Sequence, residues 1–576
     1  MIHLFFIVAL LLCFLPLLPG IIGLVLPALS WLPTLGFENV TLSAFTTVAT
    51  WPNLTTSIGL SLLSGLGSTA LALYFTYAIL KRYWGTHRWQ KLERTLSPML
   101  AMPHVAFAIG FALLFSPTGW VFRLFEALGI SNIAGIHLIQ DNLIQDSYGI
   151  GLMLALAIKE TPFLLIMSIP ILKQLNVSQL SAMSASLGYS KHEAWRKVIL
   201  PQWLPKLRLS LFAVAAYGLS VVDIALILGP TRPSTLSVLV WQWFNEPDLN
   251  LLPRAAAGAC LLVMLTAAGL GSIRAIEWFS LRYKRNWLTQ GAVPSSQVVR
   301  KPNLHLALYS PFIAIPLMII PLLLVWSFAQ RWRFPDLLPS RYSERFWQQE
   351  IPTLAELMGS SLLLALVSSA VALILVIACL EYRQRYQRAI PVWLIAIPLV
   401  TPQLSLLFGI QIVTYLVPGQ HYLLWVAWSH LIFVFPYIYL ALDGAWRSYD
   451  TRLDQCSRSL GLTAWQTWWR VKRPQVQPAI IFGLAIGISV SLAQYLPTQM
   501  LGAGRISTVT TEAVALASGQ DRRVMAIYGL LQGVLPFVFF TLAMLANRLS
   551  YRWRHYRQYS LQTPSTSTKS KEYTHG

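Results

Sequence analysis

The sequence predicts an all-α polytopic membrane protein of about twelve transmembrane helices, arranged as two homologous six-helix units. Three observations support this prediction. The 576-residue chain is 55% hydrophobic and only 11% charged, whereas soluble domains carry about 25% charged residues. Apolar runs of about 20 residues, each long enough to cross a bilayer, recur along the chain. A segment of the first half also recurs in the second half. These features exclude a soluble enzyme.

Twelve apolar runs are expected to span the membrane. The first is expected to be a retained helix and not a cleaved signal, because it lacks a preceding basic segment and stays apolar for about 25 residues. The expected spans are residues 4–28, 57–80, 97–116, 148–170, 207–229, 251–271, 305–327, 355–380, 390–417, 422–442, 478–502 and 524–546.

The basic residues predict the orientation of these spans. A net charge of +21 would suggest a nucleic-acid partner in a soluble protein, but here 32 of the 43 Lys and Arg residues lie in alternate loops and the C-terminal tail. Such a bias marks the cytoplasmic side, so both termini are predicted to be cytoplasmic and no nucleic-acid partner is expected. The opposite loops carry nine arginines: Arg123, Arg232, Arg331, Arg333, Arg341, Arg345, Arg505, Arg522 and Arg523.

The chain is predicted to be a duplication. Residues 186–235 align with 459–508 at an offset of 273 residues, without a gap and with 15 identities. Such a repeat indicates two copies of one structural unit. The predicted organisation is a first unit at 1–271, a cytoplasmic linker at 272–304, a second unit at 305–546 and a cytoplasmic tail at 547–576. The end of the tail is rich in Ser, Thr and Lys, which is typical of disorder.

The identities gather in two clusters. One lies in a basic loop on the predicted cytoplasmic side, which we call the first repeated loop (177–203) and the second repeated loop (450–476). In each copy a Gly ends one short helix, nine residues follow, and a Val and a Pro lead into the next span, which predicts a helix-turn-helix suited to docking on a partner. The alternative is a pair of duplicated loops without a partner. The other cluster, on the predicted outer side, contains Gly229, Arg232, Ser234 and Thr235, matched by Gly502, Arg505, Ser507 and Thr508.

At these residues the sequence resembles the membrane permeases of ATP-binding-cassette (ABC) importers. Their cytoplasmic motif reads Glu-Ala-Ala, three residues, Gly, nine residues, Ile-x-Leu-Pro. Neither copy here keeps the acidic residue or both alanines of the triplet, and Arg473 replaces the Leu. The copies read Ala182-Met183-Ser184, Gly188 and Val198-Ile199-Leu200-Pro201, then Gln455-Cys456-Ser457, Gly461 and Val471-Lys472-Arg473-Pro474.

Two permease units fused into one chain is the form seen in ferric-iron and thiamine permeases, and the segments Leu156–Phe163 and Pro103–Ala106 look closest to an uncharacterised fused permease of a binding-protein-dependent importer. The resemblance implies a bacterial inner-membrane location and a small molecule or ion as substrate: thiamine, ferric ion, a polyamine or a small anion. It implies that two copies of an ATPase subunit couple through these residues: Gly188, Trp195, Val198, Leu200, Pro201, Gly461, Trp468, Val471 and Pro474.

The resemblance further implies a periplasmic substrate-binding protein that delivers the solute. ATP and Mg²⁺ would be bound by the ATPase, and no cofactor, metal or catalytic residue is expected in this chain, which lacks a phosphate-binding Gly-x-x-x-x-Gly-Lys-Ser/Thr loop. The outer arginines Arg232 and Arg505, with Ser234 and Ser507, are candidates for the face that receives the binding protein. Alternatively, they build a local turn at the span ends. The basic flanks are expected to contact membrane lipid.

Polar residues within the spans are candidates for the translocation path, because ionisable groups are costly in hydrocarbon. The candidates are Lys159, Glu160, Asp223, Gln411, His430 and Gln494. For each, a buried and hydrogen-bonded structural role is the alternative, and His104 has the same alternative. Two other functional classes fit the sequence less well. A secondary active transporter with internal repeats has no reason to duplicate a cytoplasmic loop, and a membrane enzyme would need a carboxylate or His cluster at one interface.

Overall fold

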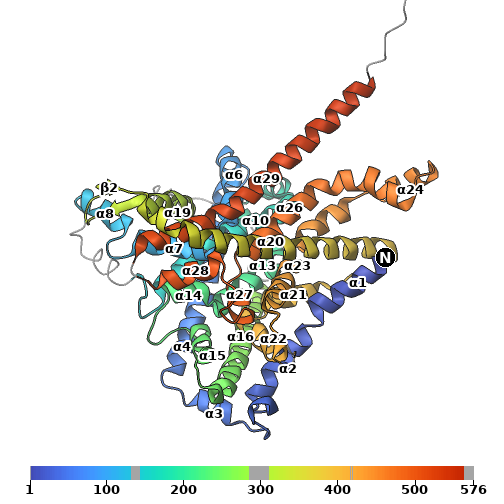
Figure 1. Ribbon diagram of the computed structural model, residues 1–576. Coiled ribbons are helices and arrows are strands. Elements are labelled where there is room, and N and C mark those ends of the chain that lie inside the picture. The colour runs from blue at the N-terminus through green and yellow to red at the C-terminus, as the bar shows by residue number, and fades with distance from the viewer. Residues whose placement is uncertain are drawn as a thin grey trace, which may run out of the picture.

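The computed structural model describes residues 2–130, 143–283, 311–415, 417, 419–519 and 521–562. Most of the predicted linker, the first residues of the seventh predicted span and the tail after Gln562 lie outside these ranges. The described chain is almost entirely helical, which confirms the predicted all-α membrane fold (Figure 1). Its one sheet is a short antiparallel pair, β1 (Ala329–Arg331) and β2 (Arg341–Tyr342), in which Ala329 pairs with Tyr342.

The first half contains helices α1 to α16. Their bounds are α1 Ile2–Ala9, α2 Leu17–Ala28, α3 Ser43–Ala49, α4 Leu54–Leu62, α5 Ser68–Tyr83, α6 His87–Ala101, α7 His104–Phe115, α8 Trp120–Ala127, α10 Ile150–Gln174, α11 Val177–Ser186, α12 Lys191–Glu193, α13 Leu200–Ser220, α14 Asp223–Leu228, α15 Leu236–Phe244 and α16 Leu252–Tyr283. Short π-helical turns at Leu10–Phe14 and Leu63–Gly67 join α1 to α2 and α4 to α5.

The second half contains helices α19 to α29. Their bounds are α19 Pro311–Phe328, α20 Arg345–Tyr386, α21 Val392–Val400, α22 Gln403–Thr414, α23 Tyr422–Ser448, α24 Arg452–Ser459, α25 Ala464–Thr467, α26 Arg473–Leu492, α27 Leu496–Leu501, α28 Val509–Ala517 and α29 Arg522–Gln562. Helices α14 and α15 begin 273 residues before α27 and α28, and α13 begins 273 residues before α26. The helix bounds therefore repeat at the interval found in the sequence.

Ten helices among the described residues are long and apolar enough to cross a membrane, and eleven if one bent pair counts as a single span. The expected number was twelve. With the bent pair counted as one span, the structure has one span fewer than expected. The missing one is the fifth predicted span, 207–229, which the structure divides between α13 and the six-residue α14. Because α13 carries Lys206 and Arg208 and ends at Ser220, it is less apolar than the other spans.

Four of the predicted spans were expected to be continuous helices but are interrupted in the structure. Proline interrupts two of them: Pro103 separates α6 from α7, so the third span (97–116) begins only at His104, and Pro402 precedes α22, which makes an angle of 95° with α21 within 390–417. A proline cannot continue the hydrogen-bond ladder of the helix before it, and it disfavours helical geometry at the preceding residue. The other two interruptions lie at 221–222, between α13 and α14, and at 493–495, between α26 and α27, within the predicted spans 207–229 and 478–502.

The first helix of each half packs on the other half. Helix α1 packs against α20 and α2 against α22, while α19 packs against α7 and α10 of the first half. The contact between α2 and α22 is a backbone-to-backbone approach: a Cβ on Gly23 would clash with the carbonyl of Gly409, and one on Gly409 would clash with the carbonyl of Gly20. Only glycine permits this approach.

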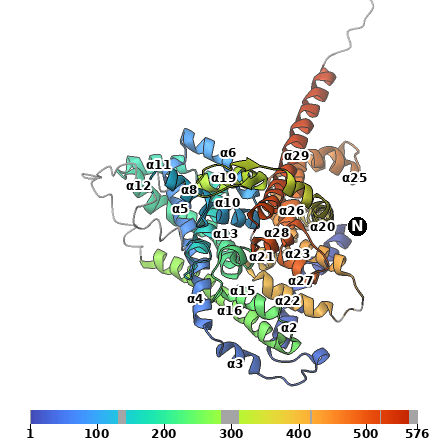
Figure 2. The same ribbon diagram turned by 60° about the vertical axis from the view of Figure 1, so that its left-hand side comes forward.

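The two repeated loops lie at the same end of the molecule. Figure 2 shows α11 and α12 of the first loop and α25 of the second loop at the end toward which α29 extends, whereas α3 lies at the opposite end. In Figure 1, α8 and β2 lie together on the side away from α24 and the N-terminus. The arrangement thus has two distinct ends, one with both repeated loops and one with α3.

Candidate functional site: two repeated loops and a polar core

The first repeated loop folds as α11, a left-handed turn, α12 and a π-helical turn at Ala194–Ile199. Gly188 has φ +83°, a conformation that side chains with a Cβ disfavour, and this explains why α11 ends there. Helix α12 begins with a capping box, in which the Ser190 hydroxyl accepts from the Glu193 backbone N–H and the Glu193 carboxylate accepts from the Ser190 backbone N–H. Val198 lies in the π-helical turn, while Leu200 and Pro201 begin α13.

The second repeated loop has the same backbone path. Gly461 has φ +85°, α25 begins with a capping box between Thr463 and Gln466, and a π-helical turn follows at Trp468–Lys472. Val471 lies in that turn, and Pro474 is the second residue of α26. A proline in the first turn of a helix is tolerated, because the N–H it lacks has no partner there. Both loops therefore lead directly into a long helix.

An aromatic cluster attaches the first loop to α5. Trp195 is 2% exposed, and its ring centroid lies 6.2 Å from that of Tyr77. The Tyr77 ring in turn lies 6.2 Å from the buried Trp203, with the Lys81 ammonium 5.7 Å from the Tyr77 centroid. Rings in such arrangements each contribute about 0.5–1.5 kcal/mol beyond their buried area. The first loop is thus held mainly by apolar and aromatic contacts.

A charged cluster attaches the second loop to α20. Lys472 is 2% exposed, and its ammonium lies 2.6 Å from Oε1 of Glu381. The same carboxylate oxygen accepts hydrogen bonds from the indole N–H groups of Trp446 (2.9 Å) and Trp468 (3.2 Å). The ring centroids of Trp446 and Tyr449 lie 5.7 and 5.2 Å from the ammonium. Burial, then the hydrogen bond to Asp454, raises the pKa of Tyr449, so its phenol stays protonated and donates to that carboxylate.

Both loops present a large apolar side chain to the outside. Leu187 is 72% exposed and Leu460 is 84% exposed, and the two occupy matching positions directly before Gly188 and Gly461. Met183 and Trp465 are also exposed. An exposed apolar patch that recurs at matching positions marks an interaction surface better than scattered single side chains do. The sequence identity Ser-Leu-Gly revealed these leucines, but only the structure shows that they point outward.

Within the spans, the Glu160 carboxylate of α10 accepts a hydrogen bond from Nε2 of His104, the first residue of α7, at 2.9 Å. The His104 ring centroid lies 4.6 Å from that of Tyr217 on α13, and the Tyr217 hydroxyl donates to Asp223 at 3.5 Å. Two predicted path residues, Glu160 and Asp223, therefore belong to one polar cluster at the interruptions of α6–α7 and α13–α14. Lys159 is 5% exposed, and no hydrogen bond or ion pair of its side chain is found within the described ranges.

The remaining path candidates lie in the second half. Gln494, between α26 and α27, accepts from the side-chain amide of Gln403 at 2.6 Å. The amide of Gln411 donates to Tyr415 at 2.8 Å, while its buried side-chain carbonyl oxygen has no hydrogen-bond partner in the described part of the chain. His430 is 1% exposed, with one ring nitrogen 2.7 Å from the Ser491 hydroxyl and the other 2.9 Å from the Thr498 hydroxyl.

The sequence reading missed Tyr217 and Gln403 as members of these clusters. The sequence did contain a signal for Gln403. It follows Pro402 as His104 follows Pro103, and each Pro-x pair interrupts a span at the corresponding place in its half. Each residue then bonds a partner elsewhere, His104 on α10 and Gln403 between α26 and α27. Interrupted helices that gather polar side chains near the middle of a membrane protein are typical of transport sites.

The second sequence cluster directly precedes two matching helices, α15 and α28, whose first N–H groups are capped by serines from elsewhere in the chain. The first N–H of α15, at Leu236, donates to Ser61, and the first N–H of α28, at Val509, donates to Ser361. Arg232, Arg505 and Ser507 are exposed, and the Arg505 guanidinium lies 5.0 Å from the Tyr422 ring centroid. Ser234 is only 4% exposed, so the prediction that it contributes to an exposed face is wrong; it lies directly before the N-cap residue of α15.

Comparison with known proteins identifies the family. The chain is 30% identical to the inner membrane ABC transporter permease protein YnjC of Escherichia coli (strain K12) over 548 residues, which cover 93% of this chain and 94% of the relative. This chain belongs to the ABC transporter permeases. It is also 36% identical over 66 residues to the probable sulfate transport system permease protein cysT of Chlorokybus atmophyticus, a match that covers 11% of this chain and 23% of that protein. No family model matches the chain.

Membership of the ABC transporter permeases confirms the family predicted from the repeated loops. The match to the first relative extends over nearly the whole chain, and the permease is of the fused type. The chain is accordingly a membrane-embedded transport component of the inner membrane.

Proposed function

We propose that this permease is the membrane subunit of an ABC importer, and that one ATPase subunit docks on each of its two repeated loops. The observation that carries the proposal is the shared architecture of the loops. Both have a left-handed Gly, a capping box, a π-helical turn and an exposed Leu, and both lie at one end of the molecule. Two like docking sites suit two copies of one partner. ATP and Mg²⁺ would bind to that partner, and this chain would hold neither.

The loops are suited to transmit movement. Each continues through its π-helical turn into α13 or α26, and each of these helices ends at an interruption beside the polar residues of the core. A displacement of the first loop would therefore move Tyr217 relative to Glu160 on α10. In the proposed cycle, the solute passes these clusters while the ATPase subunits close and open.

In this proposal the end with both loops faces the cytoplasm, together with the two termini, and the two units are 1–271 and 305–546, joined by 272–304. A periplasmic binding protein would deliver a small solute to the opposite face, where the exposed Arg232 and Arg505 form rim charges that raise the rate of association. The proposed path residues are Lys159, Glu160, Asp223, Gln411, His430 and Gln494. Four of them support this assignment most directly, because each lies at an interrupted span or bonds a residue there: Glu160, Asp223, His430 and Gln494.

The docking assignment is tested by placing a charge on the exposed leucines. Leu187→Glu combined with Leu460→Glu should abolish retention of the ATPase when the tagged permease is purified from its own membranes. It should also abolish uptake driven by ATP, because a carboxylate cannot be buried in an apolar contact without a large cost. Retention is measured by quantitative mass spectrometry and by ATP hydrolysis of the purified complex.

The matched control is Leu338→Glu, since Leu338 is 63% exposed but lies in the segment between β1 and β2. This variant should retain the ATPase and transport as the parent does. Normal ATPase retention by the double variant, in a chain that is inserted and folded, would refute docking on these loops. Loss of retention in the control as well would show that the effect is not specific to them.

A further inference from the structure

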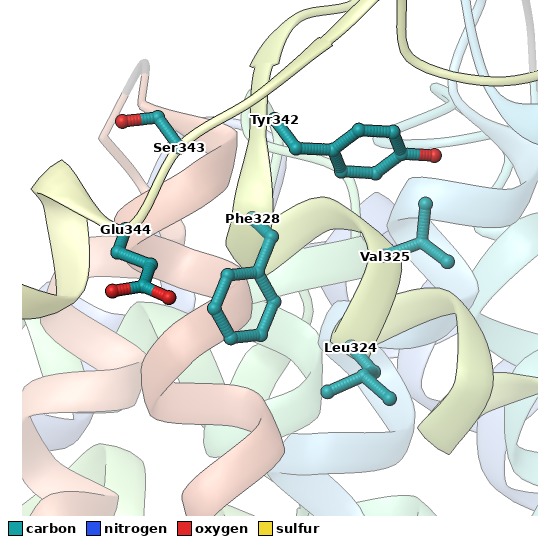
Figure 3. Close-up of a pocket in the computed structure, with 6 residues that line it drawn as sticks. All are labelled: Leu324, Val325, Phe328, Tyr342, Ser343 and Glu344. Carbon is teal, nitrogen blue, oxygen red and sulfur yellow. The ribbon is translucent and has the colours of Figure 1, made fainter.

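A pocket of about 460 Å³ lies where both halves of the chain meet, on the predicted outer side. The turn between α7 and α8, helix α8, the end of α19, the segment after β1 and the start of α29 all contribute to it. Its lining combines three arginines with aromatic rings and consists of Thr118, Arg123, Trp326, Trp332, Phe334, Asp521, Arg522 and Arg523. Figure 3 shows a neighbouring pocket of a different character, in which Leu324, Val325 and Phe328 form an apolar floor below Tyr342.

Among the described residues, the buried Arg123 side chain bonds only backbone carbonyls, and the Asp336 carboxylate acts on it from beyond ion-pair distance. Arg123 is 2% exposed, and its guanidinium donates to the carbonyls of Thr118 (3.0 Å), Arg333 (2.6 Å) and Asp336 (2.8 Å). The Trp332 ring centroid lies 4.9 Å from the guanidinium carbon. Within the described ranges, no carboxylate lies within ion-pair distance of Arg123. The three carbonyls fix its position without neutralising its charge.

Arg522 faces the same space from the first residue of α29. Its guanidinium donates to the Thr118 hydroxyl at 2.6 Å and lies 5.7 Å from the Trp326 ring centroid. Among the described residues it too has no ion pair with a carboxylate. Arg523 donates to the carbonyls of Ala329 and Gln330, and the carboxylate of Asp521 lies 3.7 Å from it. The lining thus carries three guanidinium groups and one carboxylate.

Such an arrangement is costly unless an anion completes it. Two like charges are held close together and partly removed from water, and burial of a charge without a counter-ion is strongly unfavourable. The aromatic walls lower the local dielectric constant, which strengthens both the repulsion between the arginines and their attraction for an anion. The carbonyls around Arg123 and the Thr118 hydroxyl beside Arg522 hold the two guanidinium groups at the pocket without neutralising their charges.

We propose that this pocket binds an oxyanion of the phosphate or sulfate class. Guanidinium forks match tetrahedral oxyanions through paired N–H···O hydrogen bonds, which an ammonium does not form in the same geometry. The three basic residues that line the pocket are all Arg and none is Lys, which suits the recognition of an oxyanion and not only the attraction of negative charge. The bound anion would join Arg123 of the first half to Arg522 of the second half.

Two sources supply this chemistry: the phosphate of an outer-leaflet phospholipid and a free anion on the outer side. The site is tested first with the free anion. The full chain is purified in detergent, stripped of lipid and unfolded by heat at increasing sodium phosphate or sodium sulfate, with sodium chloride holding the ionic strength constant. The apparent melting temperature of the parent should rise to a plateau with either oxyanion but not with chloride alone.

Arg522→Gln should raise the half-saturating oxyanion concentration by about tenfold or more, because it removes charge-assisted hydrogen bonds. Arg341→Gln is the matched control: it removes the same charge from the exposed β2 and should stay within about twofold of the parent. Arg522→Lys keeps the charge without the fork and should lie between them, which also provides a test if the Gln variant does not fold. No plateau in the parent, or an Arg522→Gln variant that melts lower with an unchanged oxyanion dependence, would overturn the proposal.

The two sources are separated by repeating the measurement before lipid removal and by native mass spectrometry from nanodiscs containing phosphatidylglycerol. If a lipid phosphate occupies the pocket, the parent and Arg341→Gln retain bound lipid that Arg522→Gln loses, and free phosphate stabilises only the stripped protein. If a free anion occupies it, phosphate and sulfate stabilise the parent with lipid present. Both results support the oxyanion site. Equal lipid retention by all variants, together with no effect of free anions, would refute it.

Discussion

The two repeated loops share a backbone but not the chemistry that attaches them to the membrane helices. In the first loop, Ile199 is fully buried at the position where the second loop has Lys472, 273 residues later. Lys81 of α5 and Glu381 of α20 lie 300 residues apart, and each contacts the aromatic cluster under its own loop. An apolar and aromatic attachment in one half thus becomes a buried ion pair in the other.

The comparison shows which features a shared docking geometry requires. The left-handed Gly, the capping box and the proline at the start of the next helix occur in both loops, because they determine the path of the chain. The contacts below the loop differ, because any well-packed set of side chains can support that path. Equivalent substitutions should therefore destabilise the two loops equally when they change residues that determine the backbone path. They should destabilise the loops unequally when they change the side chains that attach each loop to the membrane helices.

The largest contrast is expected at the two tryptophans. Trp195→Ala removes a fully buried ring and should destabilise the first loop by about 3–5 kcal/mol. Trp468 is only partly buried, and its loss removes some packing and one hydrogen bond, so Trp468→Ala should cost about 1–2 kcal/mol. Hydrogen exchange of residues 177–203 and 450–476 in nanodiscs measures both effects. Equal losses of protection would show that the attachments are energetically alike despite their different geometry.

The buried ion pair gives the next contrast. Lys472→Ile copies the residue of the first loop but leaves Glu381 without its cation, which should destabilise the second loop by about 3 kcal/mol. Replacing both partners, Lys472→Ile with Glu381→Leu, should recover most of that loss, because a buried pair often exchanges for apolar residues at little cost. With Glu381→Leu alone as the third variant, the single and double variants form a double-mutant cycle whose stabilities are measured by hydrogen exchange. If the double variant is less stable than Lys472→Ile alone, the ion pair is not the main attachment.

The smallest effect should be equal in the two loops. Gly188→Ala and Gly461→Ala each force a Cβ into the left-handed region, at about 1–2 kcal/mol. At Gly461 a Cβ would meet no atom within 4 Å, so the cost there comes from the backbone alone. The Asn variants are matched controls that should cost less, since Asn tolerates this conformation. Melting temperatures of the four variants test the symmetry; a pronounced difference between the loops would mean that one Gly has a packing role that the other lacks.

Composition and the ungapped repeat were sufficient to predict the membrane fold, because they rest on long-range averages of hydrophobicity and on matched residues. The family was predicted from the resemblance of the repeated loops to a permease motif. Composition and the repeat did not predict the interruptions at Val221–Val222 and at Ala493–Tyr495, because no proline occupies these positions and the neighbouring residues are mostly apolar. A helix interruption that arises from tertiary packing is not predicted by the pattern of hydrophobic residues.

The site was predicted unevenly for a similar reason. Gly188, Gly461 and the tryptophans were identified because identity across the repeat marks residues with backbone or packing roles. Two features depend on how helices distant in sequence pack together: the hydrogen bond between His104 and Glu160, and the burial of Ser234. A single sequence does not contain that information. The arginine pocket was equally hidden, since its lining comes from three separate segments.

The glycine contact between α2 and α22 has a consequence for the way the protein is made. Helix α2 leaves the ribosome early, but the helix that covers its Gly20 and Gly23 follows about 370 residues later. At about 5–20 residues per second, translation takes roughly 20–75 s to reach it. During that time the glycine face of α2 must be covered by lipid or by the insertion machinery. Because α19 of the second half packs in turn on α7 and α10, neither half completes its packing alone, and membrane assembly finishes only after the whole chain has been synthesised.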